Sequence, residues 1–221
     1  MTLIVTLCTH SAVVVAADTR RTGAVTGSFQ KTASKVRRFS NFAAGASQGL
    51  AEVTDTLFPA IAAALPPAAR FEAALALVHQ LGPAAYDQVL TSPLDVGTYR
   101  RSEPVVAGIT LGGAPRIAFV DLEHGATEEY GPGQVITAPP PGGEWLNGYA
   151  VERLHVHRTG QFLPADVWAL DVLSRGVEAF PHQVGLPGDL VVVTVSGMMH
   201  RALAYGVAAS PAFEISLAGS V

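Results

Sequence analysis

Residues 13–22 of this 221-residue chain read Val-Val-Val-Ala-Ala-Asp-Thr-Arg-Arg-Thr, a small, β-branched apolar run that ends in charge. Such a run predicts a strand that ends near Asp18. The apolar part of this stretch belongs to a run from Ser11 to Ala17, and the pair Thr9-His10 separates that run from a second one at residues 2–8. We therefore expect an antiparallel hairpin. Neither run alternates with polar residues, so both strands should be covered on two faces.

Outward from this hairpin, the pattern predicts segregated groups of strands and helices. Strands are expected at 35–39, 42–44, 104–111, 115–122, 134–137, 189–195, 201–205 and 213–217, and helices at 49–65, from Phe71 onward, at 144–154 and at 164–180. The run Pro-Pro-Pro-Gly-Gly at 139–143 reads as a loop within one domain that spans residues 1–221. This order favours an α+β fold in which helices cover antiparallel sheets.

The composition narrows the class of protein. Apolar residues make up 49% of the chain and charged residues 14%, with a mean hydropathy of +0.32. So much apolar surface favours an oligomer with large interfaces. A net charge of −4 without a basic block argues against nucleic-acid or membrane partners. The single cysteine, Cys8, reads as a core residue, and the absence of a signal-like start predicts a cytoplasmic protein.

The first fifty residues resemble a β-type subunit of the proteasome, and the bacterial relatives Anbu and the betaproteobacterial proteasome homologue in particular. The matching pieces, in order, are Thr2-Leu-Ile-Val, the stretch 13–22, Lys35-Val and Ala44-Gly45 ahead of a helix. The resemblance implies a four-layer αββα sandwich of the N-terminal-nucleophile hydrolases. It also implies a homo-oligomeric ring or stack that cleaves peptides or unfolded proteins, without a cofactor and with an ATP-dependent unfoldase as a conceivable partner.

The same resemblance implies four catalytic residues. Thr2 is the nucleophile once Met1 has been removed, and its own α-amine, with an ordinary pKa of about 7.7–8.0, takes the hydroxyl proton. Lys35 tunes both groups and Asp18 holds Lys35 in place. The N–H of Gly45 stabilises the oxyanion, an interaction worth roughly 3–4 kcal/mol.

Three further residues are implied to bind substrate. Thr22 matches a position whose backbone pairs with an extended peptide, which is a form of strand addition. Arg20 and Gly49 are expected around the pocket that receives a substrate side chain. The region 184–191, Val-Gly-Leu-Pro-Gly-Asp-Leu-Val, resembles the start of a late strand in the bacterial relatives.

Two alternatives remain open. Pro181 and Val184 stand where the proteasome has a supporting acid and serine, and the turn 142–148 has no serine, which favours a non-catalytic ring scaffold. Separately, Gly-Ala-Ser-Gln-Gly at 45–49 fits the G-x-S-x-G nucleophile elbow, with Asp189 and His200 in an allowed order for a serine hydrolase based on Ser47. Otherwise Ser47 is expected near a helix N-cap. His155 and His157 lack a third ligand at metal-binding spacing.

Overall fold

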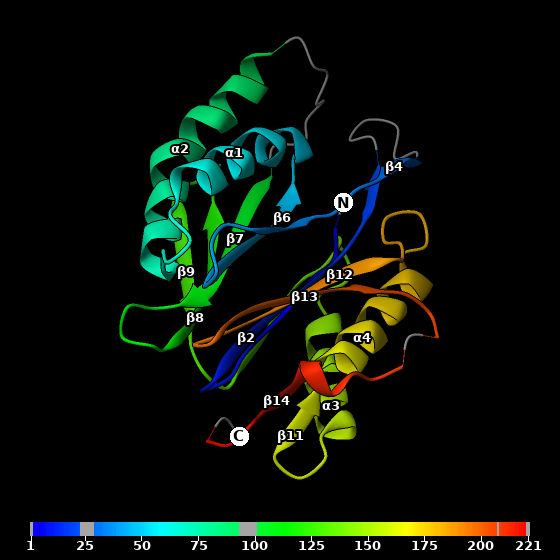
Figure 1. Ribbon diagram of the computed structural model, residues 1–221. Helices are drawn as coiled ribbons and strands as arrows, with labels where there is room; N and C mark the ends of the chain where they lie inside the picture. The colour runs from blue at the N-terminus through cyan, green and yellow to red at the C-terminus, as the bar shows by residue number, and fades with distance from the viewer. Residues whose placement is uncertain (1, 23–28, 93–100, 207, 220–221) are drawn as a thin grey trace.

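The computed structural model describes residues 2–22, 29–92, 101–206 and 208–219. In these residues the chain is mixed α+β, with antiparallel sheets and four α-helices (Figure 1). None of the helices in this part of the chain is long and apolar enough to cross a membrane.

The first large sheet carries the N-terminal hairpin at its centre. Its five strands, in the order β10-β1-β2-β12-β13, run over Gln134–Ala138, Ile4–Cys8, Ala12–Asp18, Gly188–Thr194 and Gly197–Leu203. All pairings are antiparallel, and every residue of β1 and β2 is buried. The hairpin and its coverage on both faces, predicted from the two unbroken apolar runs, are confirmed.

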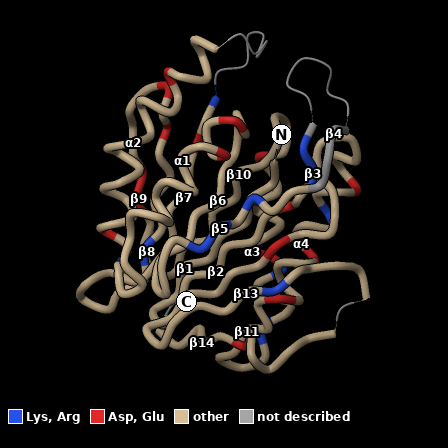
Figure 2. Tube along the Cα trace, turned by 45° about the horizontal axis from the view of Figure 1, so that its top comes forward, with Lys and Arg blue, Asp and Glu red and all other residues tan. Residues whose placement is uncertain are grey.

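The second large sheet is also antiparallel. Its strands, in the order β5-β6-β7-β8-β9, run over Val36–Arg38, Ala43–Gly49, Ser102–Ile109, Pro115–Asp121 and Ala126–Tyr130. The short strand β5 forms one edge of this sheet, and β6 lies directly beside it. Strand β5 also contacts β2 and β12 of the first sheet, and it lies near the middle of the view in Figure 2.

Helices cover the outer face of each large sheet. Helices α1 (Ala51–Ala64) and α2 (Phe71–Thr91) pack on the second sheet, and α3 (Leu146–His157) and α4 (Ala165–Ala179) pack on the first (Figure 1). Between the two sheets lies a third apolar cluster, to which β2 contributes Val13 and Val15 and β7 contributes Val105 and Ile109. The layers are therefore compatible with the α+β sandwich predicted from the order of elements.

Two smaller pairs of strands complete the fold. Strand β3 (Arg20–Thr22) pairs with β4 (Phe29–Thr32), and β11 (Phe162–Pro164) pairs with β14 (Glu214–Ser216), just after a short 3-10 helix at Pro211–Phe213. The first of these pairs continues from β2 and brings Arg21 toward α1.

Several boundaries differ from the prediction. Strand β6 continues to Gly49, whereas a strand ending at residue 44 and a helix from residue 49 were expected. Ser47 is consequently a strand residue and not a helix-cap residue, and the N-cap of α1 is Leu50, with no side-chain capping bond. Strand β13 begins at Gly197 instead of residue 201. Strand β9, which is mostly exposed and polar, has no apolar pattern from which it could be predicted.

Candidate functional site

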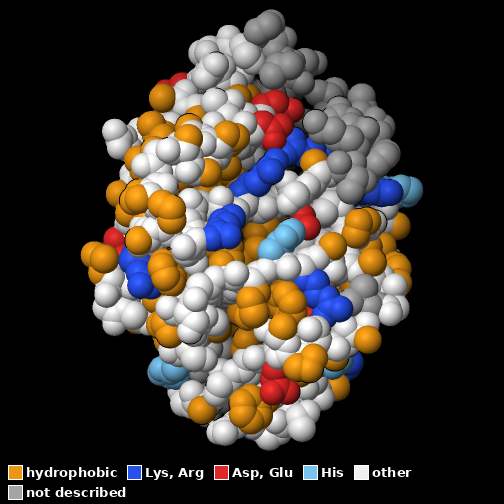
Figure 3. Space-filling model, viewed as in Figure 1, with side chains coloured by type: hydrophobic (Ala, Val, Ile, Leu, Met, Phe, Trp, Pro, Cys, Tyr) orange, Lys and Arg blue, Asp and Glu red, His pale blue; other side chains and the backbone are white. Residues whose placement is uncertain are grey.

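A pocket lies where the N-terminal segment, β5, the end of β6 and the start of α1 meet. The empty space within its bounds is about 360 Å³, a volume that includes open solvent. Of the residues predicted for the site, Thr2, Lys35 and Gly49 line it. Charged residues of both signs adjoin one another on the face of the molecule seen in Figure 3.

The central contact of this site is a buried ion pair. Lys35 Nζ lies 2.8 Å from Asp18 Oδ1, with 7% of the lysine side chain and none of the aspartate side chain exposed. Asp18 is the last residue of β2, and Lys35 directly precedes β5. The two large sheets therefore each place one partner, and the predicted contact between Asp18 and Lys35 is present.

The same carboxylate also organises the chain around Thr2. Asp18 Oδ1 accepts the N–H of Leu3 at 2.9 Å, so the residue after Thr2 is fixed to the oxygen that holds Lys35. Oδ2 accepts the N–H groups of Arg20 at 3.0 Å and Gly185 at 3.2 Å. A carboxylate with this many donors is well suited to burial, because a charge away from water needs hydrogen-bond partners.

Burial acts on both members of the pair. It raises the pKa of Asp18, and the charge and hydrogen bond of Lys35, together with the N–H groups of Leu3 and Arg20, oppose this rise. Burial likewise lowers the pKa of Lys35, against the opposing effect of Asp18. A lysine whose pKa is lowered in a pocket is a recurrent feature of sites that move protons.

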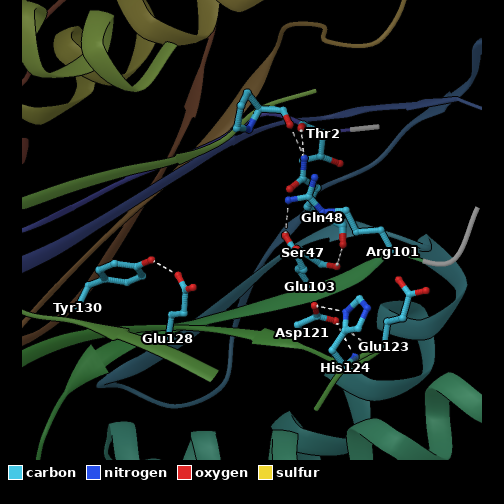
Figure 4. A network of polar contacts seen from close by, with 11 residues as sticks. Thr2, Ser47, Gln48, Arg101, Glu103, Asp121, Glu123, His124, Glu128 and Tyr130 are labelled. Carbon is cyan, nitrogen blue, oxygen red and sulfur yellow. Dashed lines mark hydrogen bonds and ion pairs between the residues drawn. The ribbon is translucent and has the colours of Figure 1, made fainter. Parts of the chain in front are cut away.

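Gln48 fixes the position of Thr2 from the other side. Its Nε2 donates to Pro139 O at 2.6 Å and to Thr2 O at 3.4 Å (Figure 4). The side chain is 2% exposed, and its Oε1 is buried with no hydrogen-bond partner in the described part of the chain. Thr2 itself is 4% exposed. Met1, on whose removal the amine of Thr2 depends, lies outside the described residues.

The two glycines predicted for the site have different positions. Gly45 does not line the pocket: it pairs with Arg37 in the middle of β6, and a Cβ at this residue would lie 2.2 Å from Phe39 Cζ. Its small size is required by packing on the helical side. Because Phe39 N bonds to Ala43 O and hydrogen-bonded pairs alternate along a ladder, the N–H of Gly45 points into the β5–β6 ladder. Gly45 is thus not placed as an oxyanion donor.

Gly49, by contrast, lies at the pocket and has a φ of +103°, which favours glycine. A Cβ there would lie 2.1 Å from Arg101 O. The N–H of Leu50 bonds to this same carbonyl, so the chain turns from β6 into α1 at Gly49. Of the two glycines, only Gly49 lines the pocket, and it lies beyond the residues of β6 that pair with β5.

The predicted substrate-binding residues are only partly brought together. The side chain of Arg20 does not line the pocket: it packs on Gly185, and its Nη1 donates to Pro181 O. The next residue, Arg21, lines the pocket instead and forms a two-pronged ion pair with Asp55 of α1, at 2.6 and 2.7 Å. Thr22 ends β3, and the backbone of that strand pairs with β4.

The geometry of a nucleophile elbow is not present at Ser47. An elbow places its serine on a sharp turn between strand and helix, whereas Ser47 is within β6 and pairs with Pro104. Asp189 and His200 belong to β12 and β13 of the other sheet, where His200 Nε2 lies 3.3 Å from Asp189 Oδ1. Ser47 contributes to the pocket as a lining hydroxyl.

The loop before β12 lacks the polar supports expected of a proteasome site. Val184 is fully buried in the apolar cluster beneath α4, and Pro181 offers its carbonyl to Arg20. The loop is nevertheless tied to the site through its backbone, because Gly185 donates to Asp18. The loop therefore helps to position Asp18 through a main-chain group, which the types of its side chains do not reveal.

The pocket contains residues that the sequence analysis did not single out. Lys35 and Arg37 are two positions apart in an extended segment, so a shared face could have been predicted from spacing alone. Arg21 and Asp55 come from β3 and α1, and no local pattern connects them. Their meeting is a consequence of tertiary structure.

Nothing in the described residues forms a group of three or more His, Cys, Asp or Glu side chains that could hold a metal ion. His157 contacts Asp171, with Nε2 at 2.6 Å from Oδ2. No protein-family model matches this chain, and no curated protein matches its sequence.

Proposed function

We propose that this protein is a threonine-type amide hydrolase of the proteasome kind, in which Thr2, freed by removal of Met1, is the nucleophile. The observation that carries the proposal is the shared oxygen of Asp18, which holds Lys35 Nζ and the N–H of Leu3 beside Thr2. A nucleophile, a nearby lysine and an orienting carboxylate are what such chemistry requires. The layered arrangement of helices and sheets also supports an N-terminal-nucleophile hydrolase fold.

In this mechanism Thr2 Oγ attacks the substrate carbonyl carbon while its proton passes to the Thr2 α-amine. The resulting oxyanion accepts a hydrogen bond from the N–H of Gly49, which replaces Gly45 in that role. Collapse of the intermediate breaks the C–N bond and returns the proton to the departing amine. Water then hydrolyses the ester on Thr2. Lys35 favours the neutral amine through its charge, and Asp18 orients Lys35.

The assembly is part of the proposal. A homo-oligomeric ring or stack in the cytoplasm would act on peptides or unfolded chains, with an ATP-dependent unfoldase as a further partner. Exposed apolar side chains along α3 and its N-cap (Trp145, Val151 and Val156) support an interface on that helix. Native mass spectrometry gives the subunit number, and a monomer at micromolar concentration would argue against the ring.

The decisive experiment is an intact-mass spectrum before and after treatment with an electrophile selective for N-terminal threonine. A mass that begins at Thr2, with one adduct mapped to that residue, is expected. Thr2→Ala should abolish both the adduct and peptide hydrolysis, whereas Thr56→Ala, an exposed threonine of α1, should preserve them. Undiminished hydrolysis in Thr2→Ala would remove Thr2 from the mechanism.

A second candidate is a ring scaffold without catalysis. It is favoured by Val184, an apolar residue where the proteasome has a supporting serine. In that case the protein would assemble, yet a chain with Thr2 exposed would neither form the adduct nor cleave peptides. The same spectrum separates the two candidates.

A further inference from the structure

The pocket beside Thr2 carries an excess of positive charge. Arg21, Lys35 and Arg37 line it, together with one carboxylate, that of Asp55. A second carboxylate, Asp18, lies fully buried behind Lys35. Two of these three cations have a carboxylate partner, and Glu52 of α1 also acts electrostatically on Arg21. Basic residues appear in blue beside the labels β3 and β5 in Figure 2.

The ion pairs show which cation is left over. Lys35 is paired with Asp18, and both Nη atoms of Arg21 are held by Asp55. Arg37 is exposed on the edge strand β5 and has no ion pair within the residues that the structure describes. The Arg21 Nε is buried and has no hydrogen-bond partner in that part of the chain. An unmatched cation and an unused buried donor in one pocket lining both call for an acceptor.

The rest of the lining is mainly polar. The hydroxyl groups of Ser34, Ser47 and Thr54 contribute to it, with Phe58 as the one aromatic wall. A pocket with several hydrogen-bond donors suits a short polar group better than a long apolar side chain. Thr2 also lines this pocket, so under the proposed function a side chain bound in it would lie next to the carbonyl that Thr2 attacks.

We propose that this pocket selects an acidic side chain, glutamate or aspartate, on the acyl side of the cleaved bond, and that Arg37 specifies it. The inference rests on the proposed function. A carboxylate neutralises Arg37 and gives the lining an acceptor, whereas a lysine or arginine side chain is repelled. Asp55 does not reverse this preference, because the charge of Arg21 balances its own.

The test uses four fluorogenic peptides that differ only in the residue before the cleaved bond: Glu, Gln, Lys or Leu. For the full-length protein we expect kcat/KM for Glu to exceed that for Gln by about tenfold, as for one charge-assisted hydrogen bond. Added salt should reduce the ratio, since Arg37 is exposed. Arg37→Gln should bring the ratio near one, and Arg37→Glu should favour the Lys peptide.

Arg38→Gln is the matched control, because Arg38 is the next residue of β5, is exposed and does not line the pocket. It removes the same charge and should keep the preference for Glu. Equal rates for Glu and Gln, or a preference for Lys or Leu, would overturn the inference and leave the hydrolase proposal intact.

Absence of hydrolysis with every peptide, together with absence of a Thr2 adduct, would count against the hydrolase proposal itself. In that case the selectivity of the pocket is tested by binding. The affinities of labelled Glu and Gln peptides for Thr2→Ala are measured by fluorescence anisotropy. Tighter binding of the Glu peptide supports an acid-selective pocket, and equal binding overturns it.

Discussion

Asp18 and Lys35 form an ion pair of 2.8 Å in which almost no side-chain surface of either partner reaches solvent. The two partners are not equivalent. The Asp18 carboxylate accepts hydrogen bonds from three backbone N–H groups, those of Leu3, Arg20 and Gly185. It also accepts a hydrogen bond from Lys35 Nζ. The carboxylate therefore carries more of the local structure than the ammonium does.

Asp18→Ala should consequently destabilise the protein more than Lys35→Met. Removal of the carboxylate takes away the acceptor of three N–H groups and the buried counter-charge of Lys35, which should cost about 3–5 kcal/mol of unfolding free energy. In Lys35→Met the carboxylate keeps its backbone donors, and the loss should be smaller. Urea denaturation of both variants measures the difference. An equal or larger loss in Lys35→Met would contradict this account of the pair.

Replacement of Gly45 or Gly49 by alanine should be destabilising for two different reasons. At Gly45 the new methyl group meets the ring of Phe39. This ring is buried and packs edge-on against Phe58, with 5.0 Å between the ring centroids. At Gly49 it meets the Arg101 carbonyl and requires a φ of +103°. Each should cost about 1–3 kcal/mol in urea denaturation.

A second substitution distinguishes these reasons. Phe39→Leu removes the ring and should recover part of the loss in Gly45→Ala but none in Gly49→Ala. Gly148→Ala in α3 is the control and should be neutral or slightly stabilising, because the added methyl group would have no atom within 4 Å. Equal recovery in both glycine variants would refute the packing explanation for Gly45.

Gln48→Leu should loosen the N-terminal segment. The substitution removes the hydrogen bonds from Nε2 to Pro139 O and Thr2 O. A loss of about 1–2 kcal/mol is expected, with faster hydrogen exchange at the Leu3 amide than in wild type. Gln88→Leu, at an exposed position of α2, should leave that exchange unaltered. Unchanged exchange in Gln48→Leu would mean that Gln48 does not fix Thr2.

Acid should weaken the contact between α3 and α4 through Asp171. This carboxylate accepts hydrogen bonds from Tyr149 at 2.9 Å, Arg153 at 2.5 Å and His157 at 2.6 Å. Burial raises the pKa of Asp171, but these bonds outweigh burial and leave the pKa below 3.8. The stabilisation is therefore complete above that value and is lost as the pH falls through the folded-state pKa.

The unfolding free energy, measured from about pH 5 down to about pH 2.5, should accordingly fall less steeply in Asp171→Asn than in wild type. Asp87→Asn, which alters an exposed residue of α2, serves as the control and should follow the wild-type curve. Parallel curves for wild type and Asp171→Asn would show that these hydrogen bonds do not favour the ionised carboxylate.

Cys8 should be unreactive in the native protein. It is fully buried in the cluster between the sheets, and burial raises the pKa of its thiol to about 12. The thiolate fraction at about pH 8 is then lower by roughly a thousandfold than for a free cysteine. Iodoacetamide should modify it only in urea, with a single adduct seen by mass. Rapid native modification would contradict the burial of β1.

The sequence was most informative where one interaction dominates locally. Unbroken apolar runs determine β1 and β2, because strands covered on both faces leave no place for polar residues. The segment around Gly45 and Ser47 was harder to predict: its sequence suggested the approach to a helix, whereas it is a strand in which Gly45 is small because Phe39 lies close. The meeting of Arg21 with Asp55 depends on how β3 is placed over α1, which no periodicity in the chain encodes.

The hydrogen bonds of Asp18 also determine how late in synthesis and folding the site can be completed. The Gly185 N–H that completes the carboxylate's set of donors lies 167 residues further along the chain. A nascent chain that has not yet added the loop before β12 therefore lacks one of the donors that fix the carboxylate next to Thr2. This local geometry is therefore complete only when nearly the whole polypeptide has been made and has folded. A fully formed pocket then indicates a fully folded molecule.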